Sequence, residues 1–386
     1  MPRSPIPLDE FEASVGPVTS AMSLPPAVYT SPEFFEFERE AIFAREWFCV
    51  GRAEQIPSEG DFLTITIAGE PLVAVRRGDG GISVLSAVCQ HRGALVAQGA
   101  GSCGRFLRCP YHWWTYDLDG RLVTAPQMHR AEGFEREEHH LPSLRVELWE
   151  GFVFACFDEA TEPLGPRLAP LAEYLDGYRL VELRTTEPVI TEGHPFNWKL
   201  MIENGIEPYH ATYLHHGQFD APKERNYTTF DVESGDAVVS VVNHGFVDAS
   251  LNPTYRPYFP VIETLSDEQR RRFGFATVLP NLMLGWQSDM VFWFLILPRT
   301  AGSIDMRWGY LVPESTHQLS VFDQLLELTH TGIEGYNAQD LPIAEAMQVG
   351  LGSRFAPRGR YSHEEEVLAR LNRWLLSRYR RADARM

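Results

Sequence analysis

"CQHRGA" (Cys89–Ala94) and "CPYHWW" (Cys109–Trp114) each place a cysteine and a histidine close together. One residue separates the pair in the first stretch, two separate it in the second, and seventeen residues lie between the two pairs. The flanking segments are short, apolar and broken by glycine and proline, which predicts that both stretches are loops between β-strands. Two opposed loops that each offer a thiolate and an imidazole predict a metal site.

The spacing of these side chains distinguishes two kinds of metal site. Zinc is often bound by four Cys and His residues, but the single residue between Cys89 and His91 is tighter than the usual zinc spacing, which favours an iron–sulfur cluster. The two stretches resemble the Rieske motif, and "CPYHWWTYDLDGRL" continues the likeness, although Trp113 stands where glycine is commoner. The resemblance implies a [2Fe–2S] cluster in which two thiolates bind one iron and two imidazoles bind the other. The implied ligands are Cys89, His91, Cys109 and His112.

Composition and charge narrow the class of protein. The chain has 386 residues, 44% of them apolar, and a formal net charge of −18. We expect a folded protein without a nucleic-acid partner, because phosphate-binding surfaces need clustered Lys and Arg. The longest apolar run, Met290–Pro298, is too short to span a bilayer. Five cysteines do not suggest a disulfide framework, so we expect a cytoplasmic protein with no membrane partner.

No site for a nucleotide cofactor is evident in the sequence. "GAGSCG" (Gly99–Gly104) formally matches the dinucleotide fingerprint, but no helix is expected after it and no βαβ unit around it, so we predict a plain loop. Reducing power for redox chemistry therefore has to come from elsewhere.

The pattern of strands and helices divides the chain into three parts, with an α+β fold class. Residues 48–158 are rich in short strands and predict an all-β domain around the two Cys/His loops. Residues 159–386 predict a larger α+β domain, with an antiparallel sheet flanked by helices. We expect the N-terminal segment, residues 1–47, to be helical and to pack on that larger domain.

Three helices have recognisable signals. Ser31 followed by proline predicts a helix start, and Ser362 with Glu365 predicts a capping box before the last helix. The stretch Val321–Leu351 predicts a helix that is interrupted near Pro342.

"NWKLMIENGIEPYHATYLHHG" (Asn197–Gly217) holds a second cluster of metal-ligating residue types. Glu203, Glu207 and His210 fall at i, i+4 and i+7, which predicts one face of a helix, and the final glycine can end that helix. His215 follows His210 by five residues, so on a regular helix the two imidazoles point in different directions. Taken alone, the stretch is a polar helix face with satisfied histidines. If both histidines bind one metal, the helix has to distort.

Together, the two motifs resemble the oxygenase component, or alpha subunit, of Rieske non-haem iron oxygenases. This family includes aromatic-ring-hydroxylating dioxygenases and choline, betaine and carnitine monooxygenases, and the resemblance covers nearly the whole chain. It implies that His210 and His215 bind a mononuclear Fe(II), with His216 as a competing ligand. A carboxylate from a late helix completes such a site and leaves positions open for O2 and substrate.

The resemblance also implies the carboxylate ligand and a connecting acid. Asp340 in "YNAQDLPIAEAMQVGL" fits the place of the ligand, with Glu345 and Glu334 as alternatives. In the family, an acid three residues before the first histidine connects the iron ligands to the cluster of the neighbouring subunit. Glu207 matches that acid, where many members have aspartate. This match implies a ring of identical subunits, which we expect to be a homotrimer.

The resemblance implies a terminal oxygenase that takes electrons from NAD(P)H through a separate reductase or ferredoxin. It would use O2 to hydroxylate or oxidatively dealkylate a small molecule, either N-methylated and betaine-like or aromatic. Cis-dihydroxylation of an aromatic ring is the alternative reaction, and an electron-transfer protein with a vestigial iron site is the alternative from another class. Phe273–Trp286 and Met290–Leu297 are candidate pocket strands, in which alternation lets at most half of the side chains face a ligand. No substrate-binding residue is predicted.

Overall fold

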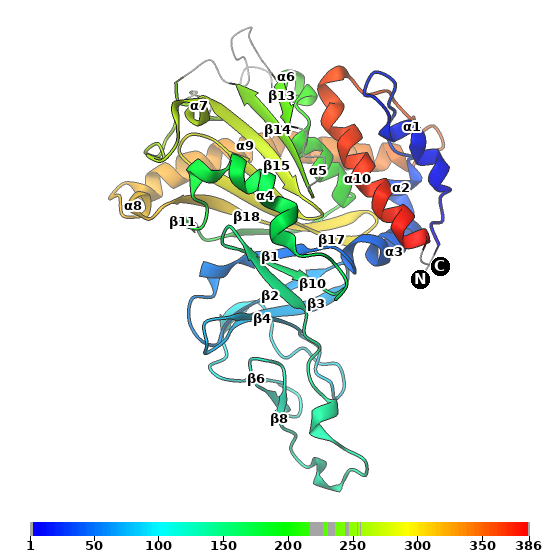
Figure 1. Ribbon diagram of the computed structural model, residues 1–386, viewed down its shortest axis with the longest axis vertical. Coiled ribbons are helices and arrows are strands. Elements are labelled where there is room, and N and C mark those ends of the chain that lie inside the picture. Colours follow the sequence, from blue (N-terminus) through cyan, green and yellow to red (C-terminus); the bar gives the residue numbers. More distant parts are fainter. Residues whose placement is uncertain are drawn as a thin grey trace. The chain divides into compact units, whose positions relative to one another are not determined.

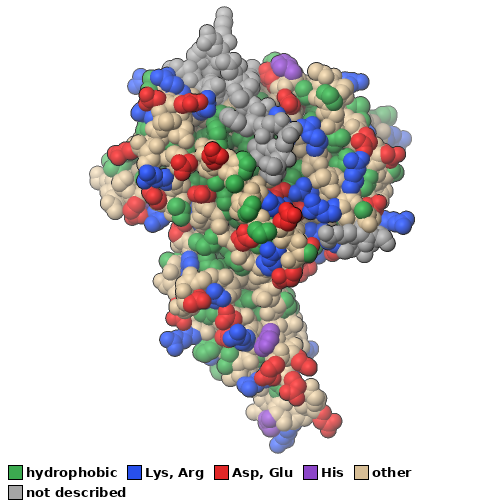
Figure 2. Space-filling view, in the orientation of Figure 1, with side chains coloured by type: hydrophobic (Ala, Val, Ile, Leu, Met, Phe, Trp, Pro, Cys, Tyr) green, Lys and Arg blue, Asp and Glu red, His purple; other side chains and the backbone are tan. Residues whose placement is uncertain are grey.

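The computed structural model describes residues 3–384, apart from 216–226, 231–235, 244–246, 253 and 255. The chain divides into two compact units, one joining Met1–Phe43 to Leu164–Met386 and the other formed by Ala44–Pro163 (Figure 1). The boundaries expected after residues 47 and 158 lie four residues after the start and five before the end of the second unit. Figure 2 shows acidic and basic side chains interspersed over the face in view, in keeping with 52 acidic and 34 basic residues in the sequence.

The unit Ala44–Pro163 is built from small antiparallel sheets whose strands are short and separated by glycine turns. The first has the order β1 (Phe48–Arg52), β10 (Phe152–Cys156), β9 (Arg145–Trp149). The second has the order β4 (Ile82–Ser86), β3 (Glu70–Arg76), β2 (Asp61–Ile67), β5 (Ala100–Ser102). The third has the order β6 (Leu107–Arg108), β7 (Thr115–Tyr116), β8 (Leu122–Thr124).

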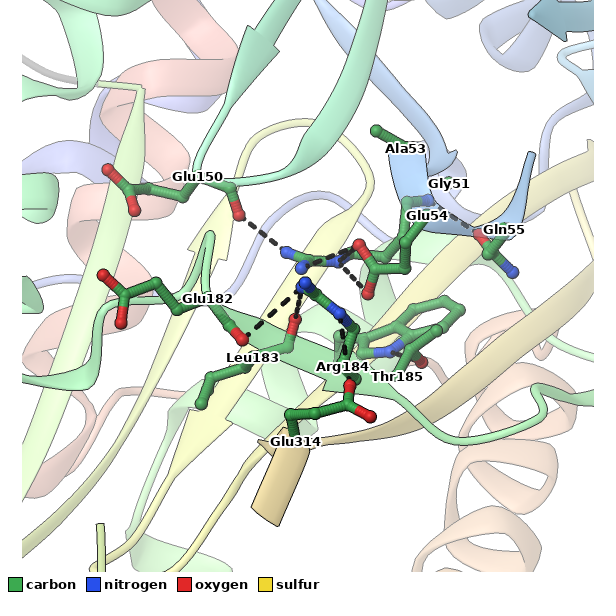
Figure 3. Close-up of polar contacts among 12 residues, drawn as sticks. Gly51, Ala53, Glu54, Gln55, Glu150, Glu182, Leu183, Arg184, Thr185 and Glu314 are labelled. Carbon is green, nitrogen blue, oxygen red and sulfur yellow. Dashed lines mark hydrogen bonds and ion pairs between the residues drawn. The ribbon is translucent and has the colours of Figure 1, made fainter. Parts of the chain in front are cut away.

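A buried arginine fixes one end of the first sheet. The guanidinium of Arg52 is fully buried and donates to the Glu54 carboxylate at 3.0 Å and to the Glu150 carbonyl at 2.6 Å, contacts that Figure 3 draws. A buried charge needs such a counter-charge and hydrogen bonds. The contacts therefore tie the turn between β9 and β10 to the end of β1.

The stretch Gly99–Gly104 was expected to be a plain loop, and the expectation is wrong for its centre. Ala100–Ser102 pairs with Asp61–Leu63 as the edge strand β5. Antiparallel pairing is formed by backbone groups. A segment of small residues, which shows no alternation of apolar and polar side chains, can therefore still pair as a strand.

The larger unit contains one eight-stranded antiparallel sheet. Its order is β11 (Leu183–Thr185), β18 (Ser303–Pro313), β17 (Val291–Thr300), β16 (Leu282–Trp286), β15 (Arg272–Val278), β14 (Ala237–Asn243), β13 (Tyr227–Phe230), and β12 (Val189–His194) also pairs with β18. The helices of this unit are α1 (Glu12–Val15), α2 (Ala27–Thr30), α3 (Pro32–Glu38), α4 (Leu164–Tyr174), α5 (Trp198–Ile206), α6 (Tyr209–Leu214), α7 (Asp267–Arg270), α8 (Glu314–His317), α9 (Phe322–Leu351) and α10 (Glu366–Asp383).

Helices α5 and α9 pack on the same face of this sheet. A Cβ on Gly205 of α5 would lie 1.9 Å from the Met283 methyl group, so the helix approaches β16 closely. His330 of α9 stacks on Trp308 of β18, with ring centroids 4.9 Å apart. Met283 and Trp308 share a face because Phe294 pairs with both across the strands.

The predicted interruption of the late helix near Pro342 is wrong. Helix α9 runs without a break from Phe322 to Leu351. A proline in a helix interior removes one hydrogen bond at a cost of about 3 kcal/mol. Here Tyr336 before it and Ala344 after it are both buried, so packing on either side keeps the helix continuous.

The other helix signals are confirmed. The Ser31 side chain accepts a hydrogen bond from the Phe34 amide at the start of α3, and Ser362 and Glu365 form the expected capping box before α10. Within the described ranges, no helix has both the length and the apolar character needed to cross a membrane.

Candidate metal centres

The first centre lies in two loops of the unit Ala44–Pro163. Cys89–Ala94 follows β4 and Cys109–Trp114 connects β6 to β7, which confirms that both stretches are loops between strands. In each loop, the amide four residues after the cysteine donates to the cysteine carbonyl, at 3.0 Å in the first and 3.1 Å in the second. The donating residues are left-handed, with φ 77° at Gly93 and φ 62° at Trp113. The two loops thus have the same hydrogen bond and the same left-handed backbone conformation at their fifth residue.

The four predicted cluster ligands are brought together by these loops. The Nδ1 atoms of His91 and His112 are 3.1 Å apart. The Cys109 thiol lies against the Cys89 thiol, and each cysteine is 2% exposed. Burial raises the pKa of the Cys89 thiol, so a bound cation is what would hold this sulfur ionised. Two sulfurs and two ring nitrogens that converge in this way fit a [2Fe–2S] cluster.

Two neighbours that the sequence did not assign support this centre. The Tyr116 hydroxyl accepts from the Gln90 amide at 3.0 Å and lies 3.4 Å from the Cys89 sulfur, so its own proton is free to point at that sulfur. The Trp114 ring stacks on His91, with centroids 4.7 Å apart and planes 11° apart. The hydroxyl contact can tune a sulfur ligand, and the stacking fixes an imidazole.

The second centre begins where the predicted helix breaks. Helix α5 ends at Ile206, Glu207 is extended with ψ 136°, and α6 starts after Pro208. A residue before proline avoids the helical region, which explains the break. The single helix face expected for Glu203, Glu207 and His210 is therefore wrong, and the Glu203 carboxylate accepts from the Tyr29 hydroxyl at 2.7 Å instead.

The end of α6 brings the two predicted histidines together, with ring centroids 5.2 Å apart. His215 follows the last residue of α6, and its Nε2 atom is 3.2 Å from Oδ1 of Asp340 on α9. Nε2 of His210 is 3.7 Å from the same oxygen. One ligand atom from each of the three residues lies within 4.8 Å of the others. Two imidazoles and a carboxylate at this spacing fit a mononuclear iron site.

The alternative ligands lie elsewhere or outside the described residues. Glu334 is 3.0 Å from the His330 ring and is mostly exposed, and Glu345 is exposed. Neither belongs to the group formed by the two histidines and Asp340. His216 and Gly217 fall outside the described residues.

The outer nitrogen of each histidine has a hydrogen-bond acceptor. His210 Nδ1 is 2.5 Å from Glu207 Oε1, and His215 Nδ1 is 2.6 Å from Gln339 Oε1. Because an acceptor oxygen faces each Nδ1, that nitrogen carries the proton and Nε2 is left for a metal. Burial lowers the pKa of His210, but the Glu207 carboxylate outweighs burial and the net pKa is raised. Asn204 Nδ2 also donates to Asp340 Oδ1 at 3.4 Å.

Family comparisons agree with both halves of the chain. Residues 46–144 match the family model described as Rieske [2Fe-2S] domain. Residues 175–381 match the one described as Ring hydroxylating alpha subunit (catalytic domain). The chain belongs to the ring-hydroxylating alpha subunit family. The predicted resemblance and the predicted fold class, an all-β Rieske domain with a larger α+β catalytic domain, are confirmed.

Two curated relatives show the range of this family. The carnitine monooxygenase oxygenase subunit of Acinetobacter pittii (strain PHEA-2) is 35% identical over 209 residues, which are 54% of this chain and 56% of that protein. The anthranilate 1,2-dioxygenase large subunit of Acinetobacter baylyi (strain ATCC 33305 / BD413 / ADP1) is 31% identical over 283 residues, 66% of this chain and 56% of that protein. The chain thus matches a little over half the length of each of these relatives.

A solved structure matches almost the whole chain. It is a quaternary ammonium Rieske monooxygenase whose structure bears on carnitine oxidation by gut microbiota and on inter-subunit electron transfer. It is 25% identical, with a TM-score of 0.80, and the match covers 97% of this chain and 99% of that chain. The cofactors of this family are a Rieske [2Fe–2S] cluster and a mononuclear non-haem iron. Both donor sets described above fit them.

An aromatic row lies on the sheet face that α5 and α9 cover. Neighbouring rings along the row have centroids 5.5–6.2 Å apart. Trp286 and Trp293 point to the opposite face, where they meet Tyr174 and Thr185. The strand pairing is thus consistent with the prediction that at most half of the side chains in the candidate pocket strands can face a ligand. The row consists of Phe273, Phe275, Phe292, Phe294, Trp308 and Tyr310.

Proposed function

We propose that this alpha subunit is the terminal oxygenase of a multicomponent system. Cys89, His91, Cys109 and His112 would hold the cluster, and His210, His215 and Asp340 would hold Fe(II). The observation that carries the proposal is the convergence of two Nε2 atoms and one carboxylate, with both outer nitrogens hydrogen-bonded. Three protein ligands would leave coordination positions of the iron available for O2 and substrate.

The two bound groups supply electron transfer and O2 activation, and the protein supplies their placement. Glu207 and Gln339 hold the Nδ1 protons of the two histidines, so both Nε2 lone pairs stay directed at one point. Asn204 donates to Asp340 and limits rotation of its carboxylate. The electrons would come from NAD(P)H through a separate reductase or ferredoxin.

The substrate class we propose is a small N-methylated, betaine-like compound. Two observations support it: relatives named for carnitine and quaternary ammonium oxidation, and the aromatic row, because aromatic faces attract quaternary ammonium groups. One oxygen atom would enter a C–H bond and the other would leave as water, with two electrons and two protons consumed. Hydroxylation beside nitrogen then leads to C–N cleavage into an amine and an aldehyde.

Cis-dihydroxylation of an aromatic ring is the second candidate reaction. It is favoured by the likeness to an anthranilate 1,2-dioxygenase subunit, and the aromatic row suits a ring equally well. The products separate the two candidates. Dihydroxylation places both oxygen atoms in one product, whereas dealkylation releases an aldehyde.

We further propose that electrons cross between subunits of a homotrimer through Glu207. Its side chain is 12% exposed, so it is not fully enclosed by its own subunit. Oε2 accepts the amides of Tyr209 at 2.5 Å and His210 at 3.1 Å, while Oε1 accepts only the His210 ring among the contacts described. Oε1 is therefore the oxygen that we expect to face His112 of the neighbouring subunit.

A cytoplasmic location remains a prediction from cysteine usage.

Metal content and O2 uptake test the proposal. Anaerobically prepared protein should contain three irons and two acid-labile sulfides per chain, and only two irons if the mononuclear site is vestigial. O2 uptake should be compared for methylated ammonium compounds and aromatic acids, with an added reductase. Stoichiometric zinc without sulfide would reject the cluster.

Mixing two inactive variants during assembly tests the route between subunits. Cys109→Ala lacks the cluster and His210→Ala lacks the catalytic iron. Mixed assemblies should regain activity if an intact cluster serves the iron of a neighbour. If verified mixed assemblies stay inactive, electrons pass within one chain.

A further inference from the structure

A residue beside the first centre adopts a backbone conformation that its side chain does not favour. Trp113 has φ 62°, a left-handed value that glycine adopts freely and residues with a Cβ do not. The loop imposes this value, because the Trp113 amide must return to the Cys109 carbonyl at 3.1 Å. The corresponding residue of the other loop is Gly93, with φ 77°. Glycine would therefore satisfy the loop conformation without strain. The indole of Trp113 must have a role other than the loop conformation.

The indole is presented to solvent beside a cluster ligand. Trp113 is 63% exposed and Tyr111 is 56% exposed. The Tyr111 ring centroid is 3.7 Å from that of His112. Arg108 lies 5.3 Å from the centre of the Trp113 ring, and Arg92 lies 5.5 Å from that of Tyr111. We call Arg92, Arg108, Tyr111 and Trp113 the Rieske rim.

The Rieske rim has the composition of a protein–protein contact. Tryptophan, tyrosine and arginine are the residues that most often dominate binding energy at interfaces. The rim carries two positive charges in a chain of net charge −18, so it suits an acidic partner surface.

The second centre borders a surface of matching character on the same chain. Tyr209 and Tyr213 of α6 are 41% and 68% exposed, with ring centroids 5.7 Å apart. Glu207 lies just before α6, and its side chain is 12% exposed. We call Glu207, Tyr209 and Tyr213 the iron rim. One rim is aromatic and cationic, and the other is aromatic and anionic.

We infer that Trp113 anchors the Rieske rim of one subunit on the iron rim of a second copy of this chain. The inference rests on the proposed function and adds the residue that holds the two subunits in register. Arg108 orients the indole before contact, which reduces the freedom lost on docking. The unfavourable φ is then retained because burial of the indole between subunits offsets it.

Two substitutions separate the side chain from the backbone. Trp113→Gly removes the indole and suits the left-handed φ, whereas Trp113→Ala removes the indole and keeps a Cβ. In the full-length, cluster-loaded protein, both should raise the dissociation constant of self-association by about tenfold or more. Trp113→Gly should melt at a higher temperature than Trp113→Ala, and both should keep the visible spectrum of the cluster. Leu148→Ser, which removes another exposed apolar side chain of the same unit, should leave association unchanged.

Sedimentation over a dilution series and single-turnover oxidation of the reduced cluster provide the readouts. The variants should transfer electrons slowly when dilute and recover at high protein concentration. Unchanged association in both variants would overturn the role of Trp113 while leaving the oxygenase proposal intact. Unchanged association with slower reduction by the external donor would assign the indole to donor docking and also overturn the inference. A native protein that turns over as a monomer would reject docking on a second copy, although not the oxygenase activity.

Discussion

The two metal centres of this alpha subunit are assembled in opposite ways. The proposed cluster ligands fall within 24 residues, Cys89 to His112, on two loops that each close with a hydrogen bond to their own backbone. The proposed iron ligands come from two segments, with 124 residues between His215 and Asp340. The first centre depends on local conformation, and the second depends on packing of α5, α6 and α9. The cluster site should therefore tolerate changes elsewhere in the chain, while the iron site should not.

The largest effect is expected at Asp340, the proposed iron ligand that tertiary packing brings to the two histidines. Asp340→Ala should abolish turnover and lower the mononuclear iron content, because two imidazoles alone hold iron weakly. The cluster spectrum should stay intact, since its ligands lie in the other unit. Metal analysis and O2 uptake measure both effects. Glu345→Ala is the control and should be active, so an inactive control beside an active Asp340→Ala would reassign the ligand.

A smaller effect is expected at the connection between the two centres. Glu207→Gln should leave both centres loaded but slow electron transfer about 10- to 100-fold, because the amide lacks the charge that holds the His210 proton. Stopped-flow oxidation of the reduced cluster measures the rate. Glu203→Gln is a matched control, because that carboxylate is held by Tyr29 instead. Equal slowing in the two variants would show that Glu207 has no special place in the route.

Gln339, the neutral hydrogen-bond partner of His215, should matter for metal binding more than for electron transfer. Gln339→Ala should weaken Fe(II) binding about tenfold, because the His215 ring loses the acceptor that fixes its Nδ1 proton. Calorimetric titration of iron-free protein measures the dissociation constant. Gln324→Ala changes an exposed glutamine on the same helix and should bind as the native protein does. An unchanged constant for Gln339→Ala would remove Gln339 from the site.

The smallest effect is expected within the cluster loops. Tyr116→Phe should lower the reduction potential by an amount on the order of tens of millivolts, because a hydroxyl directed at the Cys89 sulfur favours the reduced cluster. Spectroelectrochemical titration measures the shift. Tyr111→Phe removes a hydroxyl that accepts from Arg92 and should leave the potential unchanged. Equal potentials in all three proteins would mean that the Tyr116 proton points away from the sulfur.

The same contrast explains what the sequence could and could not predict. The cluster loops are local, so their four cysteine and histidine positions were readable from spacing. The carboxylate was placed only through family resemblance, because Glu334, Asp340 and Glu345 share one helix and only packing separates them. Gln339 and Asn204 have partners far away in the sequence, so no spacing could have indicated them.

Two prolines have opposite effects on the helices that contain or precede them. Pro208 ends the helical path before it, so the regular spacing of Glu203, Glu207 and His210 does not place them on one helix face. Pro342 was expected to interrupt a helix that stays continuous. The signal at Pro208 was present in the sequence. The outcome at Pro342 depends on buried contacts on both sides of the proline, which the sequence does not display.

The long interval between His215 and Asp340 also bears on how such a protein can change. Strands β14–β18, which carry the whole aromatic row, are encoded between these two ligands. Substitutions in this interval can change the aromatic row while the proposed iron ligands stay in place at either end. Under the proposed function, the segment that would contact the substrate is encoded apart from the ligands that would hold the iron, so a change of specificity would not require a new metal site.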